Sequence, residues 1–157
     1  MNQSATLEEV IEVGGVITDR QPVDFHRLGL AGCIDRLTVP LRRQGTYVRW
    51  ETPHHGVEIS SDCAALLYQS AQEALSNTFK HAHATDVTVR LASVFHGIRL
   101  MVADNGTGFE SVRPAAEGVN GHGLRTISQA VEEAGGTVDI TSAPGTGTAI
   151  TITIPLD

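Results

Sequence analysis

Three polar side chains share one stripe of a helix predicted in the middle of the chain. Residues 63–82 contain no Gly or Pro and are rich in Ala, Leu and Gln, a composition typical of a helix. At helical spacing, Glu73, Asn77 and Lys80 fall on one side and apolar residues on the other. A carboxylate, an amide and an ammonium in this order can take a proton, ligate a hard cation and neutralise phosphate charge. The same spacing also suits an ordinary solvated helix face.

A carboxylate ends a predicted strand farther along the chain. Alternating apolar residues at 98, 100 and 102 lead to Asp104, and Gly106 and Gly108 follow two and four residues later. A buried carboxylate at a strand end can accept a hydrogen bond from an exocyclic amine, and the glycines let the backbone approach a flat ring. Most Asp-Asn-Gly triplets are ordinary turns, which is the competing interpretation.

Two more glycine-bearing turns follow. Gly121, His122, Gly123 and Leu124 come just before a helix predicted over residues 123–134. The amides at the start of that helix would point at an anion, and His122 either donates to a phosphate or caps the turn. The last turn, Gly-Thr-Gly-Thr at residues 145–148, joins two predicted strands.

The order of these motifs identifies a family resemblance. Glu-Ala-Leu-Ser-Asn-Thr-Phe-Lys-His-Ala (73–82), Gly-His-Gly-Leu (121–124) and Pro-Gly-Thr-Gly-Thr (144–148) are similar to motifs of the ATP-binding catalytic domain of sensor histidine kinases. These kinases belong to the GHKL superfamily, together with DNA gyrase, the Hsp90 chaperones and MutL. The motifs resemble most the subgroup that works with NarL/LuxR-like response regulators, and the resemblance covers residues 46–157.

The resemblance implies a site for ATP and Mg²⁺ and a role for each residue. Glu73 would be the general base for transfer of the γ-phosphoryl group, and Asn77 would ligate Mg²⁺ through its carbonyl oxygen. Asp104 would read the adenine amino group, with Thr148 close to the base. The loop 109–120 would be the lid over the phosphates. The remaining residues expected to contact the nucleotide are Lys80, His81, Gly106, Gly108, Gly121, His122, Gly123 and Leu124.

Composition and charge limit the classes of protein to which this chain could belong. The chain has 157 residues and a net charge of −7, with no basic run, which makes direct nucleic-acid binding a poor hypothesis. Cys33 and Cys63 are expected to be buried free thiols in a reducing compartment, in keeping with a cytoplasmic segment. No apolar run approaches ~18 residues, and no signal peptide is recognised, so we expect no membrane contact by this segment.

Alternating patterns predict an α+β two-layer sandwich, the Bergerat fold that the resemblance implies. The strands are expected at 46–51, 86–93, 98–104, 138–141 and 148–154, in a mixed, largely antiparallel sheet with one apolar face. About three helices would cover that face, including one from Asp24 to Arg43 with Gly45 ending it. Residues 1–22 are interpreted as a loosely held arm or the remnant of a preceding domain, with a short helical turn around Leu7 to Ile11. The resemblance implies that residues 23–157 form the catalytic domain.

The expected partners follow from what the chain lacks. No long helical hairpin surrounds His26, so the phosphate acceptor is expected on a separate dimerisation domain, with a response regulator receiving the phosphate next. Alone, the domain should bind nucleotide and turn over very little. Two alternatives remain, an anti-sigma-factor serine kinase of the same superfamily and a non-catalytic domain whose docking is controlled by nucleotide. The pair His54 and His55 has no nearby ligand cluster and is a poor metal site.

Overall fold

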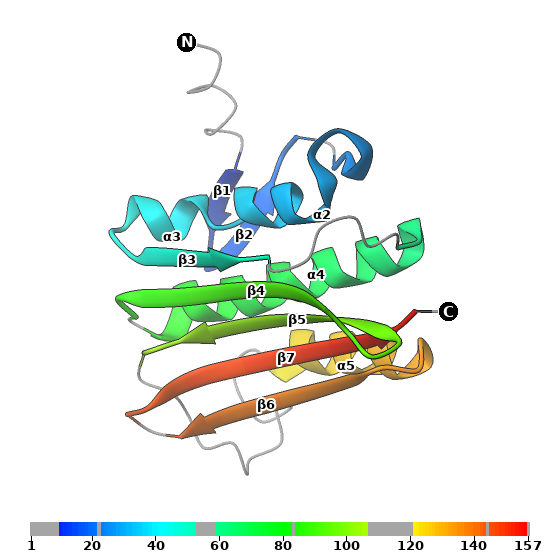
Figure 1. Ribbon diagram of the computed structural model, residues 1–157. Helices are drawn as coiled ribbons and strands as arrows, with labels where there is room; N and C mark the ends of the chain where they lie inside the picture. The colour runs from blue at the N-terminus through cyan, green and yellow to red at the C-terminus, as the bar shows by residue number, and fades with distance from the viewer. Residues whose placement is uncertain are drawn as a thin grey trace.

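The computed structural model describes residues 10–21, 23–52, 59–82, 84–106, 121–143 and 145–156, with backbone only at 26–28, 81–82 and 121–123. One five-stranded sheet dominates these residues (Figure 1). Its strand order is β3-β4-β5-β7-β6, and only the β3–β4 pair is parallel. This confirms the prediction of a mixed, largely antiparallel sheet. The strands are β3 (Tyr47–Glu51), β4 (Asp86–Val94), β5 (Gly97–Asp104), β6 (Thr137–Ala143) and β7 (Gly147–Pro155).

The sheet has one apolar face because its strands alternate. In β7, Ile150, Ile152 and Ile154 are buried, whereas Thr151 and Thr153 between them are partly exposed. In β5, Leu100 and Val102 lie opposite Ile152 and Ile150 and extend the same buried surface. The helices lie against this face (Figure 1). The other face carries exposed side chains such as those of Arg90 and Arg99.

Two helices cross the middle of the apolar face. Helix α4 (Ser61–Asn77) continues into a π-helical turn, η1 (Thr78–Ala82), and α5 (Gly121–Glu133) packs beside it. Ser60 caps α4, since its hydroxyl accepts a 3.1 Å hydrogen bond from the amide of Cys63. Helix α5 begins two residues earlier than expected.

The predicted helix over residues 24–43 is wrong as a single element. The structure divides it into α2 (Phe25–Arg36) and α3 (Val39–Arg43). Gly29 interrupts α2 with φ 73° and ψ 164°, outside the helical region, and Pro40 lies in the first turn of α3. Gly45, with φ 97°, follows the end of α3 as predicted.

The beginning of the described chain is a β-hairpin that packs into the core. Strands β1 (Val10–Val13) and β2 (Val16–Asp19) pair antiparallel, and the side chains of Val10 and Ile17 are fully buried. The interpretation as a loosely held arm, and a helical turn reaching Ile11, are wrong for these residues. Burial of Val10 and Ile17 in the apolar core holds the hairpin in place. The local sequence pattern does not indicate this burial. A domain boundary between residues 22 and 23 stays a prediction.

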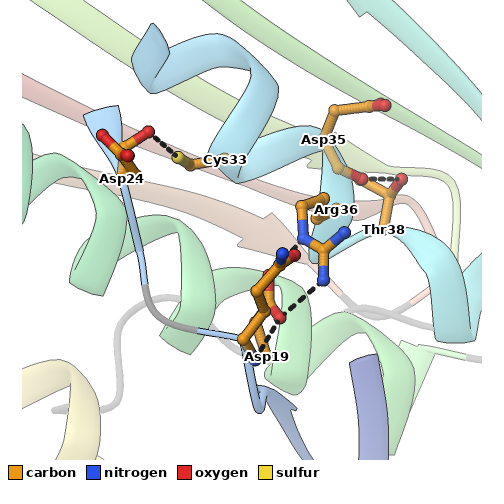
Figure 2. Close-up of polar contacts among 7 residues, drawn as sticks. Asp19, Asp24, Cys33, Asp35, Arg36 and Thr38 are labelled. Carbon is orange, nitrogen blue, oxygen red and sulfur yellow. Dashed lines mark hydrogen bonds and ion pairs between the residues drawn. The ribbon is translucent and has the colours of Figure 1, made fainter. Parts of the chain in front are cut away.

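An ion pair fastens the end of this hairpin to α2. Both oxygens of Asp19 face the guanidinium of Arg36, with an Nε–Oδ2 distance of 2.5 Å and an Nη2–Oδ1 distance of 2.8 Å (Figure 2). The side chain of Arg36 is only 12% exposed and that of Asp19 only 4%. A bidentate pair of this kind is among the stronger charge-assisted contacts. Arg43 adds a 3.1 Å hydrogen bond from its Nη1 to the carbonyl oxygen of Val10.

Both cysteines are free thiols, as predicted, but the predicted burial is complete only for Cys33. Cys33 is buried and Cys63 is half-buried, and burial raises the pKa of each thiol above its ordinary value. Among the described residues, no helix is long and apolar enough to cross a membrane.

Replacing Arg36 tests how much the hairpin contributes to stability. Arg36→Met leaves the buried carboxylate of Asp19 without its counter-charge, and we expect the free energy of unfolding to fall by about 3 kcal/mol. Arg42→Met is the matched control, because Arg42 and its partner Asp35 are 45% and 38% exposed. That change should cost at most about 1 kcal/mol. Urea denaturation measures both, and equal losses would contradict a structural role for the buried pair.

Candidate active site

Helix α4 presents two different faces, as its sequence predicts. Leu67, Ala71 and Leu75 are fully buried against the sheet. On the polar side, Glu73 and Asn77 are one helical turn apart. Both amide atoms of Asn77, Nδ2 and Oδ1, are buried, and neither has a hydrogen-bond partner in the part of the chain that the structure describes. Because buried polar groups are nearly always hydrogen-bonded, this orphaned amide indicates a binding position.

The carboxyl of Glu73 lies in a partly dry environment. Burial raises the pKa of Glu73 above its ordinary value, and the ammonium of Lys80 acts in the opposite direction. A carboxylate with a raised pKa is a better proton acceptor than one in water. Glu73 can therefore serve as a base, which is the chemistry that its position in the sequence predicts.

The turn after Asn77 differs from the continuous α-helix predicted over residues 63–82. Residues Thr78–Ala82 form a π turn, a local widening that is often found at functional sites. The buried hydroxyl of Thr78 lies 3.1 Å from the carbonyl oxygen of Ala74 and 3.3 Å from Oδ2 of Asp104. Thr78 thereby connects the end of the helix to the end of β5.

Asp104 belongs to a row of polar residues across three strands. It lies directly opposite Thr148 in the β5–β7 register, and Thr148 lies opposite Ser142 in the β7–β6 register. All three occupy the face that the helices cover, because they continue the positions of Val102, Ile150 and Ile140. Figure 1 shows that this end of the sheet is also the end toward which the last turn of α4 and the first turn of α5 point.

Hydrogen bonds fix the orientation of these groups. The carboxylate of Asp104 accepts a 2.8 Å bond at Oδ1 from the amide of Gly106. The hydroxyl of Ser142 donates to the carbonyl oxygen of Gly147 at 3.1 Å. It also lies 2.8 Å from the hydroxyl of Thr148. Either of these two hydroxyls could donate the bond between them. The hydroxyl of Thr148 also carries lone pairs that can accept a further hydrogen bond.

Glycine at position 147 allows the two strands to approach at this row. Its φ is 92°, and a Cβ there would lie 2.1 Å from the carbonyl oxygen of Asp104. Asn105, the residue after Asp104, has a structural part instead. Its Oδ1 accepts bonds of 3.0 Å from the amides of Thr85 and Asp86 and holds the strand end in place.

The structure therefore brings together part of the predicted set. Glu73, Asn77 and Lys80 lie at the end of α4, and Asp104, Gly106 and Thr148 lie at the adjoining end of the sheet. Leu124 is 6% exposed and belongs to the hydrophobic core, so it packs the start of α5. Gly121, His122 and Gly123 form the first turn of α5, and their side chains, like that of His81, lie outside the described residues. Gly108, the loop 109–120 and the pair His54 and His55 also lie outside them.

Sequence reasoning missed two residues of the site. Thr78 follows Asn77 directly, but a threonine on the apolar side of a helix reads as a packing residue. Its link to Asp104 joins residues 26 positions apart. Ser142 could have been found from the hairpin register, because pairing of Ala143 with Gly147 places Ser142 opposite Thr148.

The raised pKa of Glu73 predicts how stability depends on pH. A carboxyl with a higher pKa in the folded than in the unfolded protein opposes folding once it ionises, so its contribution to stability falls as pH rises from about 4.3 through the folded value. Glu73→Gln removes this cost. We therefore expect the variant to gain stability relative to the parent between about pH 4 and pH 7 in urea denaturation. Glu132→Gln, at an exposed position of α5, is the matched control. A difference that stays constant or reverses over this range would contradict burial of the carboxylate.

Comparison with known proteins gives this site a family. Residues 63–157 match the histidine kinase-, DNA gyrase B- and HSP90-like ATPases. The sensor histidine kinase LiaS of Bacillus subtilis is 31% identical over 146 residues, which are 92% of this chain and 39% of LiaS. Sensor protein VraS of Staphylococcus epidermidis is 28% identical, over 94% of this chain and 41% of VraS. The chain thus spans less than half of these curated relatives.

A solved structure agrees with this result. The blue-light activated histidine kinase EL346 of Erythrobacter litoralis superimposes with a TM-score of 0.61 at 27% identity, over 81% of this chain and 39% of that one. The α+β sandwich and its strand order are in keeping with this match. The chain therefore belongs to the family of histidine kinase-, DNA gyrase B- and HSP90-like ATPases.

Proposed function

We propose that this chain is the ATP-binding catalytic domain of a two-component sensor histidine kinase. It binds Mg·ATP at the end of α4 and transfers the γ-phosphoryl group to a histidine on a separate dimerisation domain. A NarL/LuxR-like response regulator then receives the phosphate. The observation that supports this most is the amide of Asn77, buried without a partner beside a carboxylate of raised pKa. Membership of an ATPase family and the sensor kinases among its relatives support the same conclusion.

The row at the sheet end suits an adenine ring. Asp104 is fixed by Thr78 and Gly106, and its remaining lone pairs can accept from the exocyclic amine of adenine. The hydroxyl of Thr148 lies opposite Asp104 in the same row and can donate or accept. An acceptor beside a hydroxyl fits an edge of adenine, which carries the exocyclic amine next to a ring-nitrogen acceptor, and the resemblance also places the base here.

Asn77 is the residue that fits Mg²⁺. Its carbonyl oxygen is the type of ligand that Mg²⁺ accepts from proteins, with waters and phosphate oxygens completing the shell. The bound ion would neutralise charge on the phosphates. Lys80 and His81, on the turn that follows, would supply further positive charge for them. The amides at the start of α5, around Gly121 to Gly123, would cradle the phosphates, with the lid at 109–120 closing over them.

Glu73 would act as the base. Phosphoryl transfer asks the protein mainly to position the groups and stabilise charge, so one carboxylate that orients or deprotonates the attacking histidine is sufficient. Its partly buried position keeps it ready to accept a proton. The acceptor histidine and its helical hairpin would belong to the parent protein's dimerisation domain, and this segment would lie in the cytoplasm. Alone, the domain would bind nucleotide and turn over slowly.

Nucleotide binding is tested by removing the adenine acceptor. Asp104→Asn keeps the size of the side chain but replaces a carboxylate oxygen by an amide donor that faces the exocyclic amine. We expect the affinity for a non-hydrolysable ATP analogue with Mg²⁺ to fall by about 1–3 kcal/mol, measured by titration calorimetry. Asp139→Asn, an exposed aspartate of β6, is the control and should bind as the parent does. Unchanged affinity in Asp104→Asn would remove Asp104 from the site.

Phosphoryl transfer is tested at Glu73. Glu73→Gln should bind the analogue as tightly as the parent and transfer phosphate about 100-fold more slowly, because the base is lost while the contacts remain. The assay mixes the domain with a separate acceptor-histidine hairpin and radiolabelled ATP. Phosphate on the hairpin that survives base but not acid identifies phosphohistidine.

The outcomes of this assay separate the candidate functions. Equal transfer rates for Glu73→Gln and the parent would exclude Glu73 as the base. Tight nucleotide binding by the parent without any transfer would contradict the kinase function and favour a nucleotide-gated docking domain. Acid-stable phosphate on a serine would instead identify a serine kinase of the same superfamily.

A further inference from the structure

The tip of the β1–β2 hairpin touches a residue of the proposed nucleotide site. Gly15 lies in the turn of the hairpin with φ 87°, and a Cβ built on it would lie 2.3 Å from Cε of Lys80. The same Cβ would lie 2.9 Å from Cδ and from Cγ. The aliphatic stem of Lys80 therefore rests on the bare backbone of Gly15, and a Cβ at this position would displace it.

This tip is held in place by hydrogen bonds close to the site. Within the turn, the amide of Gly15 donates to Oε2 of Glu12 at 2.6 Å. Beyond it, the amide of Ile17 donates to the hydroxyl of Ser76 at 3.0 Å, and its carbonyl accepts from Nε2 of Gln72 at 2.7 Å. Ser76 and Gln72 each immediately precede a site residue on α4, so the hairpin is bonded to the same turn of helix that carries Asn77 and Glu73.

The far end of the hairpin is equally fixed. The buried ion pair between Asp19 and Arg36 and the complete burial of Val10 and Ile17 leave the hairpin little freedom to shift along α4 (Figure 2). A rigid support under a long, flexible side chain restricts the rotamers that the side chain can adopt. The support is thus built from a segment about 60 residues away in the sequence from the helix it serves.

We propose that Gly15 is a positioning residue, and that the hairpin tip seats the stem of Lys80 so that its ammonium is directed to the polar face of α4. The contact of Gly15 with Lys80 stands on the geometry alone, whereas its effect on nucleotide binding rests on the proposed function. The hairpin is then a part of the site and not merely a cover over the core.

The interaction between Lys80 and Glu73 gives a readout that needs no nucleotide. Lys80 lowers the pKa of Glu73, against the effect of burial. A change that displaces Lys80 should therefore let the pKa of Glu73 rise further, while the neighbouring Glu12 is left in place in the turn. The carboxyl carbon of Glu73 reports this pKa directly in a ¹³C NMR titration.

Two adjacent glycines provide a matched pair for the experiment. Gly14 and Gly15 both have positive φ, 62° and 87°, so alanine strains the backbone at either position. A Cβ at Gly14 meets nothing within 4 Å, whereas one at Gly15 collides with the flexible stem of Lys80. Gly14→Ala and Gly15→Ala therefore share the strain and differ in the displacement of Lys80.

We expect Gly15→Ala, but not Gly14→Ala, to raise the pKa of Glu73 and to weaken binding of the Mg²⁺-loaded ATP analogue about tenfold, the loss of one charge-assisted contact. In a Lys80→Ala background, Gly15→Ala should have no further effect on either quantity. If Gly15→Ala alone does not fold, recovery of folding in the double variant with Lys80→Ala would show that the added methyl group collides with the stem of Lys80.

Equal values of the Glu73 pKa in Gly14→Ala and Gly15→Ala would overturn the proposal, as would an effect of Gly15→Ala that persists without Lys80. A change in this pKa in a protein that binds no nucleotide would support the positioning contact and contradict the nucleotide function. The two claims therefore fail separately.

Discussion

The proposed site depends on an amide group that is withdrawn from water and left without a partner. Asn77 holds both of its amide atoms in this condition at the end of α4. An unsatisfied buried polar group costs about 1–3 kcal/mol, so it persists where the rest of the fold enforces it. The apolar side of α4, with Leu67 and Leu75 fully buried on the sheet, supplies that enforcement. A ligand that contacts the buried amide atoms of Asn77 would remove this free-energy cost when it binds.

The surrounding elements can be understood as supports for this position. The π turn directs Thr78 to Asp104, which joins the helix end to the sheet end and brings the two halves of the site together. The hairpin bonds to the same turn of α4 from the opposite side, through Gln72 and Ser76. The contact of Thr78 with Asp104 joins the end of the helix to the end of the sheet, so these two ends would move together if the site opened.

Much of this could be predicted from the sequence, for physical reasons that differ between elements. The period of two in residues 98–104 and 148–154 fixed which side chains face the helices, and hence that Asp104 and Thr148 share a face. The hairpin could not be predicted, because its short strands gain their stability from burial on distant residues such as those of α4. The π turn escaped because local helix propensity does not distinguish it from an α-helical turn. The break at Gly29 falls on a glycine, which allows a positive φ without requiring one, so its exact place could not be predicted.

The central claim is that Asn77 is kept without a partner because it ligates Mg²⁺ on a bound adenine nucleotide. A crystal structure of the domain with Mg²⁺ and a non-hydrolysable ATP analogue tests it most directly. The account predicts a magnesium ion at about 2.1 Å from Oδ1 of Asn77, with the adenine amine facing Asp104. A saturating analogue bound elsewhere, or bound here with the amide of Asn77 still uncoordinated, would contradict it.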